Sequence, residues 1–364
     1  MSGESALPES SRESDDVARS RPVVAVDANG ADMGPAEVAA GAALAARQGV
    51  HVLLFGPAQE IGPVPHGVEL VDAPVSVAKS ADPVAAVRAT PQASIVQAAK
   101  AVGEGRAQAL VCAGGTGAAL AAGLFNVKRA RGVHRPALAL PLPVPGTPVT
   151  LLDVGANDQA RSEHLVQFAF MGAAFAKAVL GLERPRVGLL SNGAESERGS
   201  ELVLATGAVL RERASEDGLL FVGNVEGGDI VGGVADVIVT DGFTGNIALK
   251  LMEGVSQTML GAVRDAATSS LRGKLGGLLL RPSLRGFRDE IDPEGQGGAY
   301  LLGLRRLAVV PHGRFTRYGF AQAILRAELG AREDVVGATH AALVQARALR
   351  KVPTSADPAS LDGE

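Results

Sequence analysis

Residues 237–250 read VIVTDGFTGNIALK, and this stretch decides the fold class. Its first three residues form an apolar, β-branched run that is typical of a buried strand. Glycine and small polar residues follow and predict a tight turn, because they interrupt regular structure. Beyond the turn, Ile247, Leu251 and Val255 recur at the spacing of one face of a helix. A buried strand that passes through a turn into a helix is the repeating unit of a parallel α/β sheet.

The same alternation of strand, turn and helix continues on both sides of this stretch. Short apolar runs are separated by alanine-rich helical segments, and the runs are 23–26, 50–55, 109–112, 150–152, 186–190, 219–222, 237–239 and 307–310. Strands that are apolar on both faces and separated by helices predict a mostly parallel sheet that is covered on both sides. We therefore expect an α/β fold with a single domain over residues 22–348.

The composition is that of a globular chain without a polyanionic partner. The 364 residues include 35 Lys+Arg and 39 Asp+Glu, and the net charge of −4 argues against binding to nucleic acid. The hydrophobic fraction of 46% provides for a large core. Residues 1–21 are polar and lack the apolar region of a signal peptide, and residues 349–364 are similar in character, so both are expected to be disordered tails.

Metal and nucleotide chemistry find little support in the sequence. No glycine-rich nucleotide fingerprint occurs, and the single cysteine, Cys112, ends an apolar run where a buried structural thiol is favoured over a nucleophile. The histidines show no metal-ligand spacing; they are His51, His66, His134, His164, His312 and His340. We therefore expect no metal and no cofactor, and the lone cysteine agrees with a reducing, cytoplasmic location.

Several predicted strands lead into glycine and small polar residues, at 27–30, 113–117, 153–157, 191–193, 223–226 and 241–246. The carboxyl ends of parallel strands meet at one edge of a sheet, where ligands bind. Glycine-rich turns before helices present backbone N–H groups and the positive end of a helix dipole, which favours an anion such as phosphate. The candidate phosphate ligands are Gly115, Thr116, Gly117, Asn157, Asn192, Asn224, Thr244, Gly245 and Asn246.

Three residues near these turns are candidates for catalysis. Lys250 follows Asn246 by one helical turn, and helical side chains lean toward the N-terminus, which directs Lys250 back to the turn. Asp241 either orients Lys250 or caps the helix, and the alternative for this segment is a solvated lysine with Thr244 as a plain N-cap. His312 ends the last apolar strand, where it acts either as a general acid or base or as a hydrogen-bonded structural residue.

A basic segment without acidic residues lies at 271–288, within a predicted helical hairpin at 262–295. Its apolar tip is predicted to be the sequence GGLLL at 276–280. An apolar tip with basic neighbours suits an anionic membrane surface, an acidic carrier protein or a dimer contact, and these three alternatives stay open. The expected contact residues are Lys274, Leu278, Leu279, Leu280, Arg281 and Arg285.

Taken together, these motifs resemble the bacterial acyl-carrier-protein:phosphate acyltransferase family, known as PlsX. The matching motifs, in chain order, are DVGAN at 153–157, HLVQFA at 164–169, GNVE at 223–226, DGFTGN at 241–246 with Lys250, and HG at 312–313. The resemblance runs in the same order from about residue 23 to about residue 344.

The resemblance implies a Rossmann-like, three-layer α/β/α homodimer, related to isocitrate dehydrogenase and phosphotransacetylase folds, with a projecting helical hairpin. It implies an enzyme that converts acyl-acyl-carrier-protein and inorganic phosphate into acyl-phosphate for phospholipid synthesis. A membrane glycerol-3-phosphate acyltransferase would use the product, and the hairpin would touch the inner face of the membrane. Because phosphate is itself a nucleophile, the site must hold it beside the thioester and stabilise the developing oxyanion, and backbone amides, Asn157, Asn224, Asn246 and Lys250 are expected to do both.

The chain departs from the family pattern where charged residues are usual. The first turn reads DANGADM at 27–33, without the family's histidine, and the segment 88–94 lacks two lysines. Loss of a cation that contacts phosphate weakens the interaction with phosphate by roughly 1–3 kcal/mol. Either Arg198 and Arg314 replace these charges, or the chain is a divergent relative that uses another acceptor or binds carrier protein or membrane without catalysis.

Overall fold

The computed structural model describes residues 21–144, 149–217 and 219–350, and its centre is an eleven-stranded sheet with the order β3-β2-β1-β4-β11-β10-β5-β6-β9-β7-β8. The strands are β1 (Val23–Asp27), β2 (His51–Gly56), β3 (Val68–Asp72), β4 (Ala109–Cys112), β5 (Ala137–Leu142), β6 (Val149–Leu152), β7 (Arg186–Ser191), β8 (Leu220–Glu226), β9 (Val237–Val239), β10 (Ala299–Leu302) and β11 (Leu307–Val310). Neighbouring strands are parallel, except that β10 is antiparallel to β11 and β5, and β5 is antiparallel to β6.

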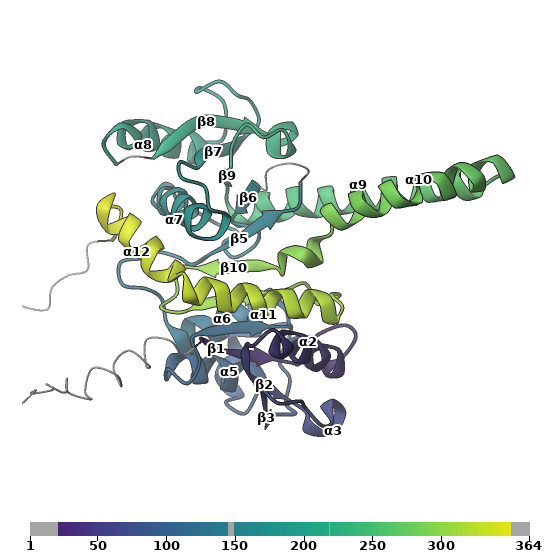
Figure 1. The fold of residues 1–364 in the computed structure, drawn as a ribbon. Coiled ribbons are helices and arrows are strands. Elements are labelled where there is room, and N and C mark those ends of the chain that lie inside the picture. Colours follow the sequence, from purple (N-terminus) through teal and green to yellow (C-terminus); the bar gives the residue numbers. More distant parts are fainter. Residues whose placement is uncertain (1–20, 145–148, 218, 351–364) are drawn as a thin grey trace, which may run out of the picture.

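Helices cover both faces of this sheet (Figure 1). They are α2 (Pro35–Arg47), α3 (Ala58–Ile61), α4 (Pro83–Ala89), α5 (Ser94–Gly103), α6 (Thr116–Ala122), α7 (Ser162–Leu180), α8 (Glu201–Asp217), α9 (Gly242–Thr268), α10 (Leu271–Glu290), α11 (Arg317–Arg332) and α12 (Val335–Gln345), with short turns η1 (Gly123–Val127), η2 (Gly227–Val231) and η3 (Pro293–Gln296). One apolar core includes Val38 of α2, Phe168 of α7 and Phe320 of α11, and a second includes Ile95 of α5 and Ala119 of α6. The predicted three-layer α/β/α fold is confirmed.

Three strands lack the β-branched pattern on which the sequence prediction depends. β3 lies at an edge of the sheet and is half buried, so its sequence VELVD is interrupted by acidic residues. β5 reads ALALPL, which is rich in residues that favour helices and contains Pro141. β10 has only four residues, AYLL. Because β5 and β10 make the antiparallel pairs, the predicted sheet is mostly but not wholly parallel.

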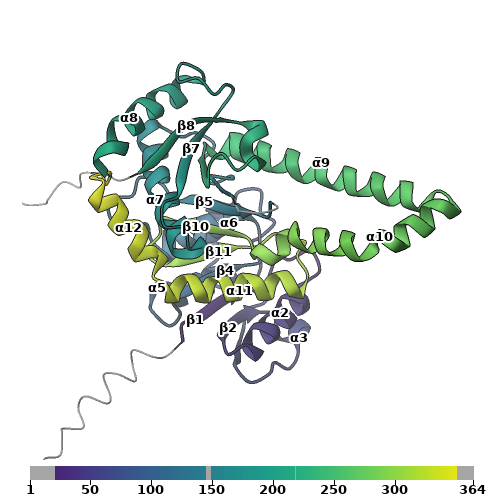
Figure 2. The ribbon, with the colours of Figure 1, turned by 45° about the horizontal axis from the view of Figure 1, so that its top comes forward.

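The helices α9 and α10 project from the sheet as a hairpin whose two arms meet at the far tip and diverge toward the sheet (Figure 2). The hairpin begins with α9 at Gly242, well before the predicted start at residue 262, and α10 ends at Glu290. The predicted apolar tip is wrong, because the sequence GGLLL lies inside α10 and the turn is made by Ser269 and Ser270. The Ser269 hydroxyl donates to the Ala266 carbonyl at 2.9 Å, so this serine terminates α9. Within the described residues, no helix combines the length and the apolar character that crossing a membrane requires.

The two predicted tails lie almost entirely outside the described residues. At the N-terminal boundary, the Arg21 guanidinium donates to the Gln48 carbonyl at 2.7 Å. At the C-terminal boundary, Leu349 packs against the core and the Arg350 backbone N–H donates to the Gly132 carbonyl at 2.8 Å. Residues 21, 349 and 350 are therefore attached to the fold, although the sequence assigns them to the tails.

Candidate functional site

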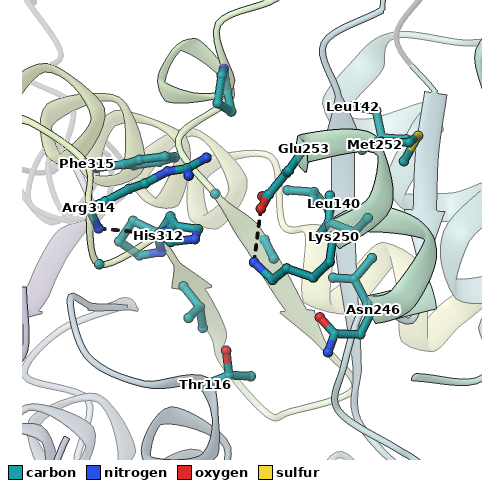
Figure 3. A pocket seen from close by; sticks show the side chains of 18 of the residues that line it. Thr116, Leu140, Leu142, Asn246, Lys250, Met252, Glu253, His312, Arg314 and Phe315 are labelled. Atoms are coloured by element: carbon teal, nitrogen blue, oxygen red, sulfur yellow. Dashed lines mark hydrogen bonds and ion pairs between the residues drawn. The ribbon is translucent and has the colours of Figure 1, made fainter. Parts of the chain in front are cut away.

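A cleft of about 1080 Å³ opens at the carboxyl ends of β1, β4 and β11, between the sheet and α9 (Figure 3). Its polar side is formed by the turns that follow these three strands, and its apolar side by β5 and by one face of α9. The described residues that carry polar side chains into it, with the Gly115 turn, are Asp32, Lys79, Thr116, Asn246, Lys250, Glu253, Ser256, Gln257, Asp292, His312 and Arg314. The cleft therefore combines a polar rim that suits an anion with an apolar wall.

The start of α9 is fixed by its N-cap and by two glycines. Asp241 accepts a hydrogen bond from the Thr244 backbone N–H at 2.8 Å and another from the Thr244 hydroxyl at 2.7 Å. A Cβ on Gly242 would lie 2.7 Å from the Asn157 nitrogen, and one on Gly245 would lie 2.0 Å from the Asp153 carbonyl oxygen. The glycines of the DGFTGN motif thus let the helix begin directly against the turn after β6, and Asp241 caps the helix.

Lys250 extends from the third turn of α9 into the cleft. Its ammonium nitrogen lies 3.0 Å from Glu253 Oε2, so Asp241 does not orient it (Figure 3). Asn246 lies one turn earlier on the same helix, and Figure 3 shows Lys250, Asn246, Thr116 and His312 around one open space. The cleft is therefore lined on different sides by a cation, an amide, a hydroxyl and an imidazole.

His312 follows β11 and faces Lys250 across the cleft. The Arg314 backbone N–H donates to His312 Nδ1 at 3.3 Å, and the Phe315 ring is stacked on the imidazole. Burial lowers the pKa of His312, and the nearby Arg314 and Lys250 cations lower it further. The neutral ring therefore predominates at neutral pH, and because Nδ1 accepts a hydrogen bond, its proton sits on Nε2. This arrangement favours a hydrogen-bond donor over a general base.

The cleft includes only part of the predicted phosphate-binding set. Gly115, Thr116 and Asn246 line it. The predicted residues outside the described lining are Gly117, Asn157, Asn192, Asn224, Thr244 and Gly245.

The side chains of two predicted asparagines hold the backbone instead of facing the cleft. The Asn157 amide donates to the Pro136 carbonyl and to Asp153 Oδ2, both at 2.8 Å. The Asn224 amide donates to the carbonyls of Glu195 and Arg198, and Asn224 lies inside β8 and not in the turn that the sequence predicts. These bonds leave neither amide N–H₂ group free to reach a ligand.

Several lining residues are not in the predicted set. Lys79, Asp32 and Glu253 bring charges into the cleft, and Glu253 is recognisable in the sequence as an i, i+3 partner of Lys250. Of the two proposed replacements for missing cations, Arg314 lines the cleft, whereas Arg198 is an exposed residue 3.9 Å from Glu195. The apolar wall also escapes sequence reasoning; it includes Leu138, Leu140, Leu142, Val144, Leu249 and Met252.

A separate cluster of possible metal ligands lies at the start of α7. His134, Glu163 and His164 place one ligand atom each within 4.8 Å of one another. The Arg161 backbone N–H donates to His164 Nδ1 at 3.2 Å, so the neutral ring carries its proton on Nε2. Burial lowers the pKa of both histidines, the Glu163 carboxylate raises it, and neighbouring arginines lower it. The bond at His164 Nδ1 leaves Nε2 as the nitrogen of this ring that is open to a further partner.

Known proteins resemble this chain over most of its length. The family described as "Fatty acid synthesis protein" matches residues 23–337. A phosphate acyltransferase of Anoxybacillus flavithermus is 43% identical over 319 residues, which are 86% of this chain and 94% of that protein. A phosphate acyltransferase of Thermobifida fusca is 42% identical over 313 residues, covering 84% of this chain and 87% of the relative.

Solved structures with the same arrangement have low sequence identity and support the fold alone. A phosphotransacetylase from Streptococcus pyogenes superposes with a TM-score of 0.59 at 14% identity, covering 84% of this chain and 93% of the other. The EutD phosphotransacetylase from Staphylococcus aureus gives 0.56 at 18% identity, with 85% and 94% covered. From the family match and the identity to its members, the chain belongs to the phosphate acyltransferase family, PlsX.

Proposed function

We propose that this protein transfers the acyl group of an acyl-acyl-carrier-protein to inorganic phosphate and releases acyl-phosphate for phospholipid synthesis. The observation that carries this proposal is the cleft in which Lys250 and Asn246 face the Gly115–Thr116 turn beside an apolar wall. Family membership supports an acyltransferase, and the cleft supplies separate places for an anion and an acyl chain.

Phosphate binding is assigned to the polar rim. The turn at Gly115 and Thr116 begins α6, so its backbone N–H groups and the helix dipole favour an anion. Lys250 and Asn246 approach from α9 and supply a cation and an amide. Their shared role is to hold one phosphate oxygen beside the thioester carbon, which replaces a bimolecular encounter by a positioned one.

The reaction then needs no covalent intermediate on the protein. An oxygen of hydrogenphosphate forms a bond to the carbonyl carbon, and the bond from that carbon to sulfur breaks. The carrier thiolate leaves and receives, through water, the proton that the phosphate gives up on becoming acyl-phosphate. Negative charge develops on the carbonyl oxygen before sulfur departs. The Nε2–H of His312 and the ammonium group of Lys250 are the donors assigned to this oxygen, and one such donor contributes about 10²–10³-fold to the rate.

The apolar wall is assigned to the acyl chain. Leu138, Leu140 and Leu142 lie on β5, and Leu249 and Met252 face them from α9. Burial of each additional methylene of a chain against such a wall contributes about 0.8 kcal/mol. The proposal therefore expects activity to depend on acyl chain length.

The outer hairpin is assigned to partners. Apolar side chains recur every four residues along α9 and are exposed; they are Phe243, Ile247, Leu251, Val255, Met259 and Val263. Leu275 and Leu279 of α10 are also exposed, near the basic residues Lys274 and Arg281. This surface suits a second copy of the chain in a homodimer and a peripheral contact with anionic lipid at the inner face of the membrane. A membrane glycerol-3-phosphate acyltransferase would receive the acyl-phosphate there.

A second candidate is a relative that binds acyl-carrier protein or membrane without this turnover, or that uses another acceptor. The observation in its favour is the presence of three carboxylates in the cleft, those of Asp32, Glu253 and Asp292. They reduce the positive potential available to a phosphate dianion.

Turnover of a defined substrate separates these candidates. Purified protein is given acyl-acyl-carrier-protein with phosphate, and free carrier thiol and hydroxylamine-trapped acyl-phosphate are measured together. The first proposal predicts equal amounts of both products that depend on phosphate. Thiol release with other acceptors alone supports a different acceptor, and carrier binding without release supports the non-catalytic candidate.

A further inference from the structure

A buried polar network lies directly behind the glycine turns of the cleft. Asp27 ends β1, is paired in register with Cys112 of β4, and is 1% exposed. Its Oδ1 accepts a hydrogen bond from the Ser94 hydroxyl at 2.6 Å and another from the Asn29 backbone N–H at 3.1 Å. One carboxylate oxygen therefore joins the start of α5 to the first turn of the chain.

The same network reaches a loop on the cleft wall. The Asn29 amide donates to Ser94 Oγ at 2.9 Å and to the Ala73 carbonyl at 3.1 Å. The loop that begins at Ala73 continues to Ala78 and Lys79, which line the cleft. Asp27 therefore holds the backbone of Asn29, and the side chain of Asn29 holds the start of this loop.

The first turn packs closely against the loop and against the turn after β4, which is the turn assigned to anion binding. Gly30 has a φ of +103°, and a Cβ there would lie 2.5 Å from Ala78 Cβ and 2.7 Å from Gly114 Cα. The first turn, the loop and the turn after β4 therefore touch at one point. A Cβ on Gly114 would lie 3.3 Å from the Asn29 carbonyl oxygen, so the backbone of Asn29 packs directly against the residue that precedes Gly115.

The carboxyl group is also electrostatically unusual. Burial raises the pKa of Asp27 to about 7, although the bonds from Ser94 and Asn29 act in the opposite direction. The titratable group that faces it from β4 is Cys112, whose pKa is raised by burial and by Asp27. Among the described neighbours, no cation contributes to the pKa of Asp27. Both the charged and the uncharged carboxyl group keep Oδ1 as an acceptor, so the network needs the acceptor and not the charge.

We propose that Asp27, Ser94 and Asn29 are positioning residues that set the shape of the anion-binding wall formed by Gly30, Lys79 and residues 114–116. None of the three lines the cleft, so each acts through the backbone it holds. The inference rests on the proposed function in one respect, which is that the anion bound at this wall is phosphate.

The test is a comparison of two substitutions at Asp27. Asp27→Ala removes the acceptor, and we expect the KM for phosphate to rise about tenfold with kcat changed less than about twofold, as for a lost buried hydrogen bond. Asp27→Asn keeps Oδ1 as an acceptor, and we expect the KM to return to within about twofold of the wild-type value. This rescue distinguishes positioning by the acceptor from a requirement for the charge.

Three further variants guard against loss of folding. Ser94→Ala and Asn29→Ala break the network at its other members and are expected to raise the phosphate KM about tenfold as well. The matched control is Thr206→Val, which removes a buried hydroxyl on α8 that donates to the Leu202 carbonyl at 2.7 Å. It is expected to lower Tm without changing the KM for phosphate.

The outcomes are decisive in either direction. The inference is overturned by unchanged phosphate KM values in Ser94→Ala and Asn29→Ala, or by an equal rise in Thr206→Val. Sulfate-dependent thermal stabilisation provides a readout without turnover: we expect sulfate to raise the Tm of the wild type and to do so about tenfold less effectively in Ser94→Ala. If the wild type shows no turnover but sulfate still stabilises it more than Ser94→Ala, the proposed function alone is contradicted. If sulfate raises the Tm of the wild type and of Ser94→Ala equally well, the inference is contradicted.

Discussion

The two halves of α9 belong to one helix but lie in opposite surroundings. The inner half begins against the turn after β6, where Gly242 and Gly245 allow backbone to approach backbone, and it carries Asn246 and Lys250 into the cleft. The outer half projects beside α10, and Met259 and Val263 are 66% and 52% exposed. A single helix therefore joins a closely packed chemical site to an unoccupied apolar surface.

This contrast separates residues that position substrate from residues that meet partners. Changes at Gly242, Gly245, Asn246 and Lys250 of the inner half should alter the fold or the chemistry, because the two glycines pack against backbone and the two polar side chains line the cleft. Changes beyond Leu260, where α9 no longer lines the cleft, should alter association and leave the chemistry intact. The predictions below test this division, beginning with the largest expected effect.

Gly245→Ala is expected to be the most damaging substitution. Its Cβ would lie 2.0 Å from the Asp153 carbonyl oxygen, which is backbone and cannot rotate away. We expect a loss of about 3 kcal/mol or more in the free energy of unfolding, together with most activity. Urea unfolding and turnover measure both, and a stable, active variant would show that α9 does not depend on this close approach.

Lys250→Ala is expected to lower kcat/KM about 100-fold while Tm stays nearly unchanged. The Lys250 side chain in its ion pair with Glu253 is 55% exposed, so the pair contributes little to stability. Lys274→Ala, on the outer hairpin, is the matched control and should keep full turnover of soluble carrier substrate. An undiminished rate in Lys250→Ala would remove this residue from the chemistry.

The double variant Leu275→Glu, Leu279→Glu tests the outer surface. These leucines lie one helical turn apart on α10 and are 62% and 75% exposed. Loss of two apolar contacts and addition of two negative charges should weaken sedimentation with anionic vesicles about tenfold or more, with turnover unchanged. Thr268→Glu, near the serine turn, is the control. Vesicle binding equal to that of the wild type would exclude this face as the lipid contact.

The pKa of His312 reports on the distance between this residue and Lys250 across the cleft. Burial, Arg314 and Lys250 lower the pKa of His312 in that order, so removal of the lysine charge should raise this pKa toward its ordinary value. On acidification, the His312 imidazole would then take up its second proton at a higher pH than in the wild type. A proton NMR titration of Lys250→Ala measures this shift, and Lys274→Ala should show none. No shift in Lys250→Ala would place the lysine away from the imidazole.

Gly261→Ala should have the smallest effect, and in the opposite direction to Gly245→Ala. A Cβ at residue 261 meets no atom within 4 Å, so only helix propensity changes. We expect a gain of about 0.5–1 kcal/mol in stability without any change in turnover. A loss of stability measured by urea unfolding would indicate a partner packed against the outer half.

Local signals explain how much of this molecule can be predicted from its sequence. Residues 237–250 predict their strand, turn and helix correctly because each signal depends on near neighbours. By contrast, β5 is hidden by its alanine and leucine content, and its place beside β10 depends on contacts far away in the sequence. The apolar wall of the cleft is missed for the same reason.

The asparagines show where site prediction reaches its limit. Asn157, Asn224 and Asn246 all lie in short glycine-rich motifs, yet Asn246 lines the cleft and the other two donate to backbone carbonyls. The direction of each side chain depends on backbone angles and on the packing of distant segments, which residue type does not encode. The sequence therefore predicts the edge of the sheet that carries the site, and only the fold selects the residues that face it.

The most direct test of the account is a crystal structure of the active protein soaked in phosphate. We predict tetrahedral density in the cleft, within hydrogen-bonding distance of the Gly115–Thr116 turn and of Lys250 and Asn246 on the inner half of α9. Density for phosphate elsewhere, with this cleft empty in crystals of protein that turns over, would contradict the account.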